Sequence, residues 1–506
     1  MALTNLDFRL PSPDFAAGES LDLSPDTEVE VEISNPLFET DTLPGALIYP
    51  FTVPNTPKNR RLLAFPGYLA ATRVRNQFFV CDLYLLGVLW RRGQLSVVKR
   101  TAEGFELSFQ TDVGDVSTQL TDVQLADVPM PTVPLTRTVG PSWPDRLYGL
   151  PTVCNSLFYP EKDATTLNYQ GLVNAYKNGV YDTTQPLVPM PYLRAVVEQV
   201  CAYIGYSLAG TFFSDAEIQT LLLYSNQAVD PTAANVVLSQ HLPNQAVPDF
   251  IKAWRALFCL SLVFDPVRKR LEVDALRDVL ANPAYVDWTD RAEAVFEWEP
   301  NTSAGYYLKQ TLDDDDDLSK NAPASEYELK IGGAQEEIEV DASSLSMQRG
   351  LATATALSTS PEILLPVTVQ KGNSPLLPDE EKNEVSLRFL FDRGLRADAG
   401  GASYPLASAE AVNYQGRPAG NYSLRWDGPQ GLYQVWHKDW LDFRARTETI
   451  TRGVRLRLAD LLQLDPRRKV LIRAAEGTTL AFWQSINVTI SQQDGIQSAQ
   501  IPFFKI

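Results

Sequence analysis

Histidine is almost missing from this chain of 506 residues, which contains only His241 and His437. A histidine-dependent triad, or a metal site with several histidine ligands, would have to be built from these two residues alone. No nucleophile elbow, P-loop or glycine-rich dinucleotide motif is present either. We therefore expect a structural protein rather than an enzyme, without a cofactor or a bound metal, and with both histidines in structural or surface positions.

Cysteine is also sparse, and Cys81, Cys154, Cys201 and Cys259 each lie in an apolar stretch far from the others. No Cys-x-x-Cys pair and no Cys/His spacing typical of a metal site occurs. The pattern predicts buried free thiols rather than a disulfide framework.

Long apolar runs and excess positive charge are missing as well. No window of about 18 apolar residues could span a membrane, and the N-terminal sequence lacks the basic segment and apolar run of a signal peptide. We expect a soluble protein made in the cytoplasm. The net charge of −18 argues against tight binding to nucleic acid or to an anionic membrane surface.

Proline and apolar residues together mark the most distinctive segment, residues 35–66. Its prolines, at positions 36, 44, 50, 54, 57 and 66, argue against a regular helix or a central strand through its middle. So many apolar side chains on an extended segment must be buried against something. We predict a docking arm that contacts a neighbouring subunit, although a long loop over the chain's own sheet explains the pattern equally well. The predicted assembly contacts are Phe38, Tyr49, Phe51, Val53, Leu62, Leu63 and Phe65.

Alternating apolar and polar residues predict β-structure at both ends of the chain. Residues 27–34 (TEVEVEIS) are typical of a half-buried strand, and glycine turns separate further strands up to residue 127. We predict an antiparallel β-barrel or sandwich over 1–127 and a proline-rich connector over 128–190. Residues 296–506 return to β-structure, with loops at 313–325 and 342–383 that are mobile or ordered by a partner.

The middle of the chain, 191–295, has helical periodicity instead. Residues 192–204 and 247–258 predict amphipathic helices, and a capping box at 214–217 predicts a further short helix up to 223. A β-hairpin is expected over 260–274. The fold class is therefore mainly β with an α+β insert, a helix–hairpin module.

Two other features suggest binding sites. In the run Asp313–Asp317 alternate aspartates match the first ligand positions of a calcium loop, but Leu318 replaces the turn glycine. A solvated acidic loop is the favoured interpretation. Several tryptophans could form a sugar platform, although buried core positions are favoured: Trp288, Trp298, Trp426, Trp436, Trp440 and Trp483.

Three stretches carry a resemblance to a known family. They are LIYPFTVPNTPKNRRLLAFPGYL (47–69), the segments 191–210 and 241–280 with the DWTD that follows, and the run from GLYQVWHKDWLDF to the C-terminal INVTISQQDGIQSAQIPFFKI. Together they span most of the chain. The sequence resembles the tail-tip, or baseplate, hub proteins of tailed bacteriophages that are encoded beside the tape-measure protein.

This resemblance implies a virion protein of the phage tail that forms a homo-oligomer, a trimer in the family. Tail-tube-like β-barrel domains would continue or close the tube, and the α+β insert would brace the periphery. The implied partners are the tail tube or distal tail protein, the tape-measure protein and receptor-binding or fibre proteins. DNA would pass only transiently, during genome ejection after host attachment. We find no peptidase or lysozyme segment of the kind that some hubs carry.

Two other classes of protein stay open at this point. One is a secreted all-β protein that binds carbohydrate or cleaves glycosides, since two facing carboxylates cannot be recognised or excluded from the sequence alone. The other is a soluble scaffold unrelated to phage.

Overall fold

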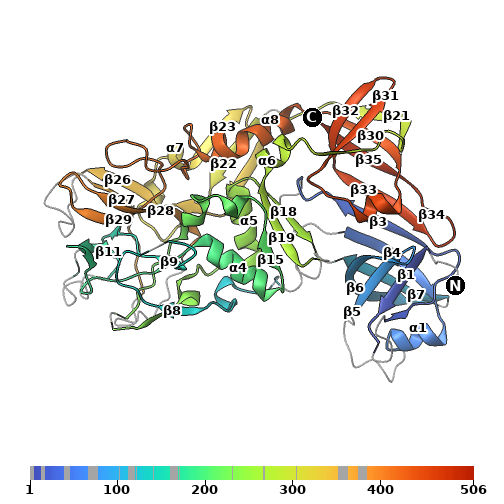
Figure 1. Ribbon diagram of the computed structural model, residues 1–506, viewed down its shortest axis with the longest axis horizontal. Helices are drawn as coiled ribbons and strands as arrows, with labels where there is room; N and C mark the ends of the chain where they lie inside the picture. The colour runs from blue at the N-terminus through green and yellow to red at the C-terminus, as the bar shows by residue number, and fades with distance from the viewer. Residues whose placement is uncertain are drawn as a thin grey trace.

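The computed structural model describes residues 5–12, 18–38, 46–65, 78–101, 103–111, 120, 122–140, 142–159, 169, 171–230, 232–265, 268–303, 305–350, 363–373 and 385–506. Figure 1 shows two bodies side by side. The β body is built from residues up to 111, from 285–299 and from 448–506, and the α+β body contains the chain between these parts. The fold is mainly β with helices grouped in the α+β body.

The β body is one curled sheet of 15 strands to which both ends of the chain contribute. Its N-terminal elements are β1 (Leu6–Leu10), β2 (Glu19–Ser20), β3 (Glu28–Ser34), β4 (Ala46–Pro54), α1 (Pro57–Leu62), β5 (Phe78–Leu85), β6 (Val88–Arg100) and β7 (Gly104–Thr111). Its later elements are β20 (Tyr285–Asp287), β21 (Ala292–Glu299), β30 (Thr449–Arg455), α9 (Leu458–Leu462), β31 (Lys469–Ala474), β32 (Gly477–Trp483), β33 (Ser485–Ser491), β34 (Gly495–Ile496) and β35 (Ser498–Lys505).

The two ends of the chain meet where β3 pairs antiparallel with β33. Val31 lies opposite Val488 and Ile33 opposite Ile486, so the apolar faces of both strands enter one core. The glutamates of β3 lie on the other face, as the strict alternation of residues 27–34 predicts. This pairing joins the predicted N-terminal and C-terminal β regions in a single sheet. The predicted domain boundary at 295/296 falls inside β21.

The α+β body contains all the longer helices of the described residues. Its first part has β8 (Thr132–Pro134), β9 (Tyr148–Gly149), β10 (Val153–Asn155), β11 (Leu172–Val173), β12 (Tyr176–Lys177), β13 (Val180–Tyr181), β14 (Met190–Pro191), α4 (Leu193–Tyr203), β15 (Ser207–Ala209), β16 (Leu221–Leu223), β17 (Asn235–Val237), α5 (Val247–Leu257), β18 (Leu260–Asp265), β19 (Arg270–Ala275) and α6 (Leu276–Ala281). Its second part has β22 (Gly305–Gln310), α7 (Ala324–Tyr327), β23 (Glu328–Gly332), β24 (Glu336–Val340), β25 (Ser343–Ser344), β26 (Ser346–Gly350), β27 (Ile363–Thr368), β28 (Arg388–Ala397), β29 (Ser403–Ser408) and α8 (Lys438–Arg446).

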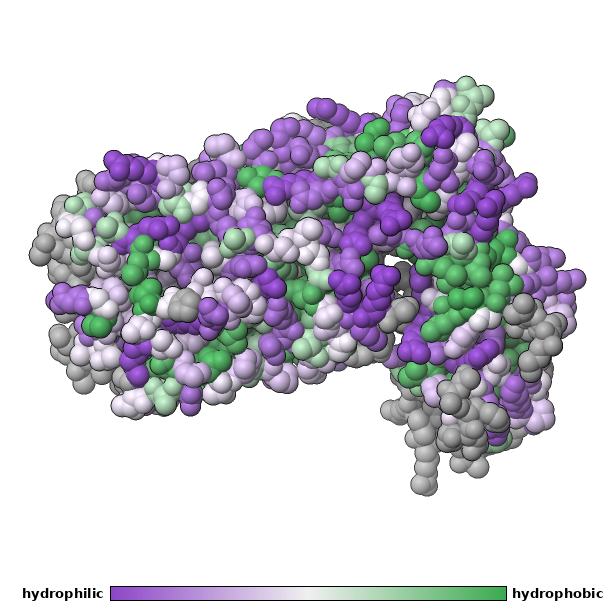
Figure 2. All heavy atoms as spheres, viewed as in Figure 1, coloured by the Kyte–Doolittle hydropathy of each residue, from purple (hydrophilic) through white to green (hydrophobic). Residues whose placement is uncertain are grey.

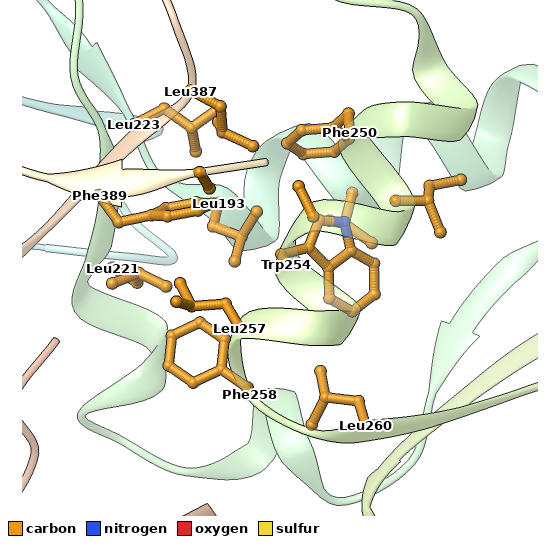
Figure 3. Packing of buried hydrophobic residues seen from close by; sticks show 14 of the residues in the cluster. Leu193, Leu221, Leu223, Phe250, Trp254, Leu257, Phe258, Leu260, Leu387 and Phe389 are labelled. Carbon is orange, nitrogen blue, oxygen red and sulfur yellow. The ribbon is translucent and has the colours of Figure 1, made fainter. Parts of the chain in front are cut away.

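Helices α4 and α5 lie within a residue or two of the predicted spans, and the β18–β19 hairpin is also present. Their apolar faces meet β16 and β28 in a large core, in which Trp254 is fully buried (Figure 3). The predicted short helix at 214–223 is reduced to one 3₁₀ turn, Ile218–Thr220, and its last residues form β16 instead. Asp215 accepts hydrogen bonds from the amides of Glu217 and Ile218, but β16 then leaves the turn to pair with β28. A buried β pairing outweighs the local capping signal there.

The loops predicted to be mobile are largely ordered where the structure describes them. Residues 343–350 form β25 and β26, and 363–368 form β27, which pairs with β26 and β10. Residues 351–362 and 374–384 lie outside the described residues. The small side chains of this region had suggested mobility, but Ser343 and Ser344 are buried beside β28.

Candidate assembly surfaces

The predicted docking arm is largely part of the β body. Strand β4 pairs with β3 on one side and with β7 on the other, so a central strand does run through the segment. The prolines are placed where they do little harm to it. Pro50 lies in a bulge of the β4–β7 pairing, Pro54 ends the strand, and Pro57 opens α1 behind the capping side chain of Thr56. The sequence-based exclusion of a central strand was therefore wrong.

The predicted assembly contacts differ in burial. Phe51, Val53 and Leu63 are core residues of the β body, where Phe51 stacks on Phe8 with ring centroids 4.7 Å apart. They satisfy their apolar surface within the chain, so their prediction as contacts to another subunit is corrected. Leu62 packs partly against the same core. The side chain of Tyr49 lies outside the described residues, and Phe65 is 46% exposed, so its contact role stays a prediction.

Phe38 packs between the two bodies of the chain. Its ring lies 4.6 Å from that of Phe504 in β35 and 5.5 Å from that of Trp440 in α8. The preceding Asn35 donates to the carbonyl oxygen of Trp483 at 2.8 Å, and Arg255 of α5 donates to the carbonyl of Pro36 at 2.7 Å. The start of the arm is therefore a joint inside one molecule.

Arg467 supplies a second link between the bodies. It lies in the turn before β31, and its guanidinium donates to Asp274 of β19 at 2.8 Å and also to Glu272. Asp465 binds the same guanidinium at 3.1 Å. Hydrophilic residues gather at the notch between the two bodies on the face shown in Figure 2. The joint is thus apolar at residues 37 and 38 and ionic at Arg467.

A cavity of about 360 Å³ lies beside the joint, between α5, α8 and β24. Its lining includes Trp440 and His437, the carboxylates of Asp249, Glu339 and Asp341, and the basic side chains of Lys252, Arg255 and Arg444. Burial, helped by the negative charge of Asp249, raises the pKa of Asp341. The cavity offers apolar, acidic and basic surface, but its histidine is not poised for proton transfer. Burial lowers the pKa of His437 to about 4, and Nε2 faces the carbonyl oxygen of Leu257 at 3.0 Å.

His241 is likewise a structural residue. It is 1% exposed, and burial lowers its pKa to about 3. Its Nδ1 lies 3.4 Å from the hydroxyl oxygen of Ser225, which is also buried. The two histidines are therefore neutral near pH 7 and are held in separate parts of the core, in line with the structural positions predicted for them.

The four cysteines are free thiols, as predicted. Cys81, Cys201 and Cys259 are buried and Cys154 is partly buried. Burial raises the pKa of Cys201 and of Cys259 to about 12, so these thiols stay protonated and unreactive.

The acidic run at 313–317 is only partly a solvated loop, because Asp314, Asp315 and Asp317 are exposed whereas the other two aspartates are not. Asp313 and Asp316 are buried around Arg388, whose Nη1 donates to Asp316 at 2.8 Å. Burial raises the pKa of Asp316, but hydrogen bonds from Thr368 and from the amide of Val369 outweigh it and lower the pKa overall. The described part of the chain contains no group of three or more His, Cys, Asp or Glu side chains arranged to hold a metal ion.

Most of the highlighted tryptophans are core residues, as favoured by the sequence. Trp288, Trp426, Trp436, Trp440 and Trp483 are buried, whereas Trp298 in β21 is 52% exposed.

Within the ranges that the structure describes, no helix has the length and apolarity needed to cross a bilayer.

No protein-family model and no curated protein matches the chain. Several solved structures are similar to it, and three of them are tail proteins. The 43 kDa tail protein of prophage MuSo2 from Shewanella oneidensis is 9% identical and aligns over 99% of this chain and 97% of its own, with a TM-score of 0.37. A tail protein from Neisseria meningitidis MC58 is 11% identical over 99% and 96% of the two chains, with a TM-score of 0.36. Prophage tail protein gp18 from Listeria monocytogenes EGD-e is 9% identical over 98% and 94%, with a TM-score of 0.38.

Proposed function

We propose that the chain is a structural virion protein, an oligomeric hub at the tip of a phage tail. In this role it forms a trimer, continues or closes the tail tube, and anchors the distal tail and receptor-binding proteins through which the genome is delivered. The tape-measure protein ends on it. It performs no catalysis.

The observation that carries this proposal is the single curled sheet formed by both ends of the chain. Strands from the first 111 residues and from the last 58 are locked together through β3 and β33. Such a sheet is a stiff wall, and it agrees with the tail-tube-like β domains that the sequence resemblance implies. The α+β body is attached to it through Phe38 and Arg467, as a brace would be.

The acidic charge of the chain suits a protein that DNA passes without binding. A net charge of −18 repels phosphates, and binding to DNA depends on lysine and arginine contacts. We propose that carboxylates of the hub face the channel.

The test has two readings. Mass photometry of the purified chain should give a discrete oligomer, with rings in negative-stain images, and gold-labelled antibodies should mark the distal end of the tail on phage particles. A chain that stays monomeric at micromolar concentration and is absent from particles would overturn the proposal. Glycan binding by such a monomer would point instead to the carbohydrate-binding class.

A further inference from the structure

Strand β21 leaves the core of the β body uncovered at one edge. Its two aromatic side chains, Trp298 and Phe296, lie on the same face as the core residues of the sheet. Each stands at the end of a row of residues that lie directly opposite one another on β35, β30 and β21. In one row Phe503 is 1% exposed, Ile450 7% and Trp298 52%. In the next, Ile501 is fully buried, Arg452 is 2% exposed and Phe296 40%. These rows end in aromatic surface that an added strand would cover.

The backbone of β21 is open on the same side. Within the described part of the chain, β21 pairs only with β30, and its other edge carries no strand (Figure 1). Natural edge strands are usually protected by proline, by lysine or by their shortness. This strand has eight residues, six of them exposed, and contains neither proline nor lysine. Its protective features are an irregular start, a bulge between Ala292 and Phe296, and its glutamates, which repel a like-charged strand.

The outer face of β21 selects the charge of an added strand. Glu297 and Glu299 alternate with the aromatics and lie opposite Thr451 and Thr449. No ion pair to either glutamate occurs among the described residues. Pairing of β21 with its own copy would bring these like charges together, which is unfavourable, whereas lysine or arginine would be attracted. The charge therefore favours a basic partner over a second copy.

We propose that the free edge of β21 binds an extended segment of a partner protein, in which apolar residues alternate with lysine or arginine. The apolar side chains extend the rows of Trp298 and Phe296, and the basic ones pair with Glu297 and Glu299. The backbone of the segment completes the hydrogen bonds of the edge. This inference deepens the proposed function. It rests on that proposal for one point only, that the partners of the chain are structural proteins.

The experiment uses the full chain and two labelled, amidated peptides, one alternating valine with lysine and the other valine with glutamate. Fluorescence anisotropy should show that the basic peptide binds about tenfold more tightly. Its lysines attract Glu297 and Glu299, whereas the glutamates of the other peptide repel them. Hydrogen exchange should slow in residues 295–299 when the basic peptide is added. In the double variant Glu297→Lys, Glu299→Lys the preference should reverse.

Strand β24 provides the matched control. It is also an edge strand with exposed glutamates, so Glu336→Lys with Glu337→Lys changes the same total charge away from β21 and should leave the preference intact. Equal affinity for both peptides, or no change of exchange in β21, would overturn the inference. Slower exchange in β21 on concentrating the chain alone would assign the edge to a second copy and would also overturn it. The proposed function is judged separately, by oligomer size and by position in the virion, and the peptide-binding results leave both unaffected.

Discussion

At the scale of single residues, Arg388 has the most constrained environment. Its guanidinium is fully buried, stacks 4.4 Å from the ring centroid of Tyr224, and binds Asp316 and Gln370. Asp313 lies 3.5 Å away and also accepts from the hydroxyl of Ser386. One arginine therefore neutralises charges that would otherwise be very costly in the core.

The variant Arg388→Met should lose about 3–5 kcal/mol of unfolding free energy, because it leaves buried carboxylates without a counter-charge. Urea unfolding at neutral pH measures this loss. Arg396→Met is the matched control, since Arg396 belongs to the same strand but is exposed, and its change should stay within about 0.5 kcal/mol. Similar unfolding midpoints for both variants would contradict a structural role for the buried pair.

At the scale of elements, β4 shows how a proline-rich segment becomes a central strand. The strand tolerates Pro50 because a bulge removes that residue from the regular hydrogen bonding, and it ends at Pro54. The side chains of Phe51 and Val53 then enter the core of the β body instead of a neighbouring molecule.

Phe51→Asp should therefore unfold the β body rather than only block assembly. The carboxylate would lie against Phe8 without a partner, at a cost of several kcal/mol. Phe65→Asp changes an exposed position and should leave stability within about 0.5 kcal/mol. Thermal unfolding followed by circular dichroism compares the two. A fully stable Phe51→Asp chain that fails to assemble would restore the docking interpretation for that residue.

At the scale of the whole molecule, the two bodies are joined by an aromatic cluster and by ion pairs. In the cluster, Phe482 of β32 lies beside Trp440 and Phe443 of α8. Phe38 adds to the apolar part of the joint, Arg255 of α5 donates a hydrogen bond to the carbonyl of Pro36, and Arg467 forms the ionic part. The hub proposed here needs this joint to be stiff, because the α+β body would otherwise swing relative to the wall.

Arg467→Glu should loosen the joint by about 1–3 kcal/mol, between the values for exposed and for fully buried ion pairs. The variant brings a fourth carboxylate close to those of Glu272, Asp274 and Asp465, with which Arg467 forms ion pairs. Small-angle X-ray scattering should show a larger radius of gyration, with faster hydrogen exchange at residues 35–38. Arg473→Glu, which breaks an exposed pair with Asp287 inside the β body, is the control. An unchanged radius in both variants would show that the remaining contacts, including those of Phe38 and Phe482 with Trp440, hold the bodies together without Arg467.

The sequence by itself determined the local elements. Helices α4 and α5, the β18–β19 hairpin and the alternation of β3 follow from periodicity over a few turns or residues, and they lie where that periodicity predicts. The free thiols and the buried tryptophans also follow from residue type and neighbours.

Only the tertiary structure decided which distant segments meet. The pairing of β3 with β33, the burial of Asp316 by an arginine 72 residues later, and the uncovered row at Trp298 all depend on contacts between remote parts of the chain. Local patterns state that a residue needs a partner, but they do not say which one, because burial and charge pairing are satisfied equally by any complementary surface. The arm at 35–66 was misjudged for that reason: its apolar residues did need a partner, and for Phe51, Val53 and Leu63 the chain itself supplied it.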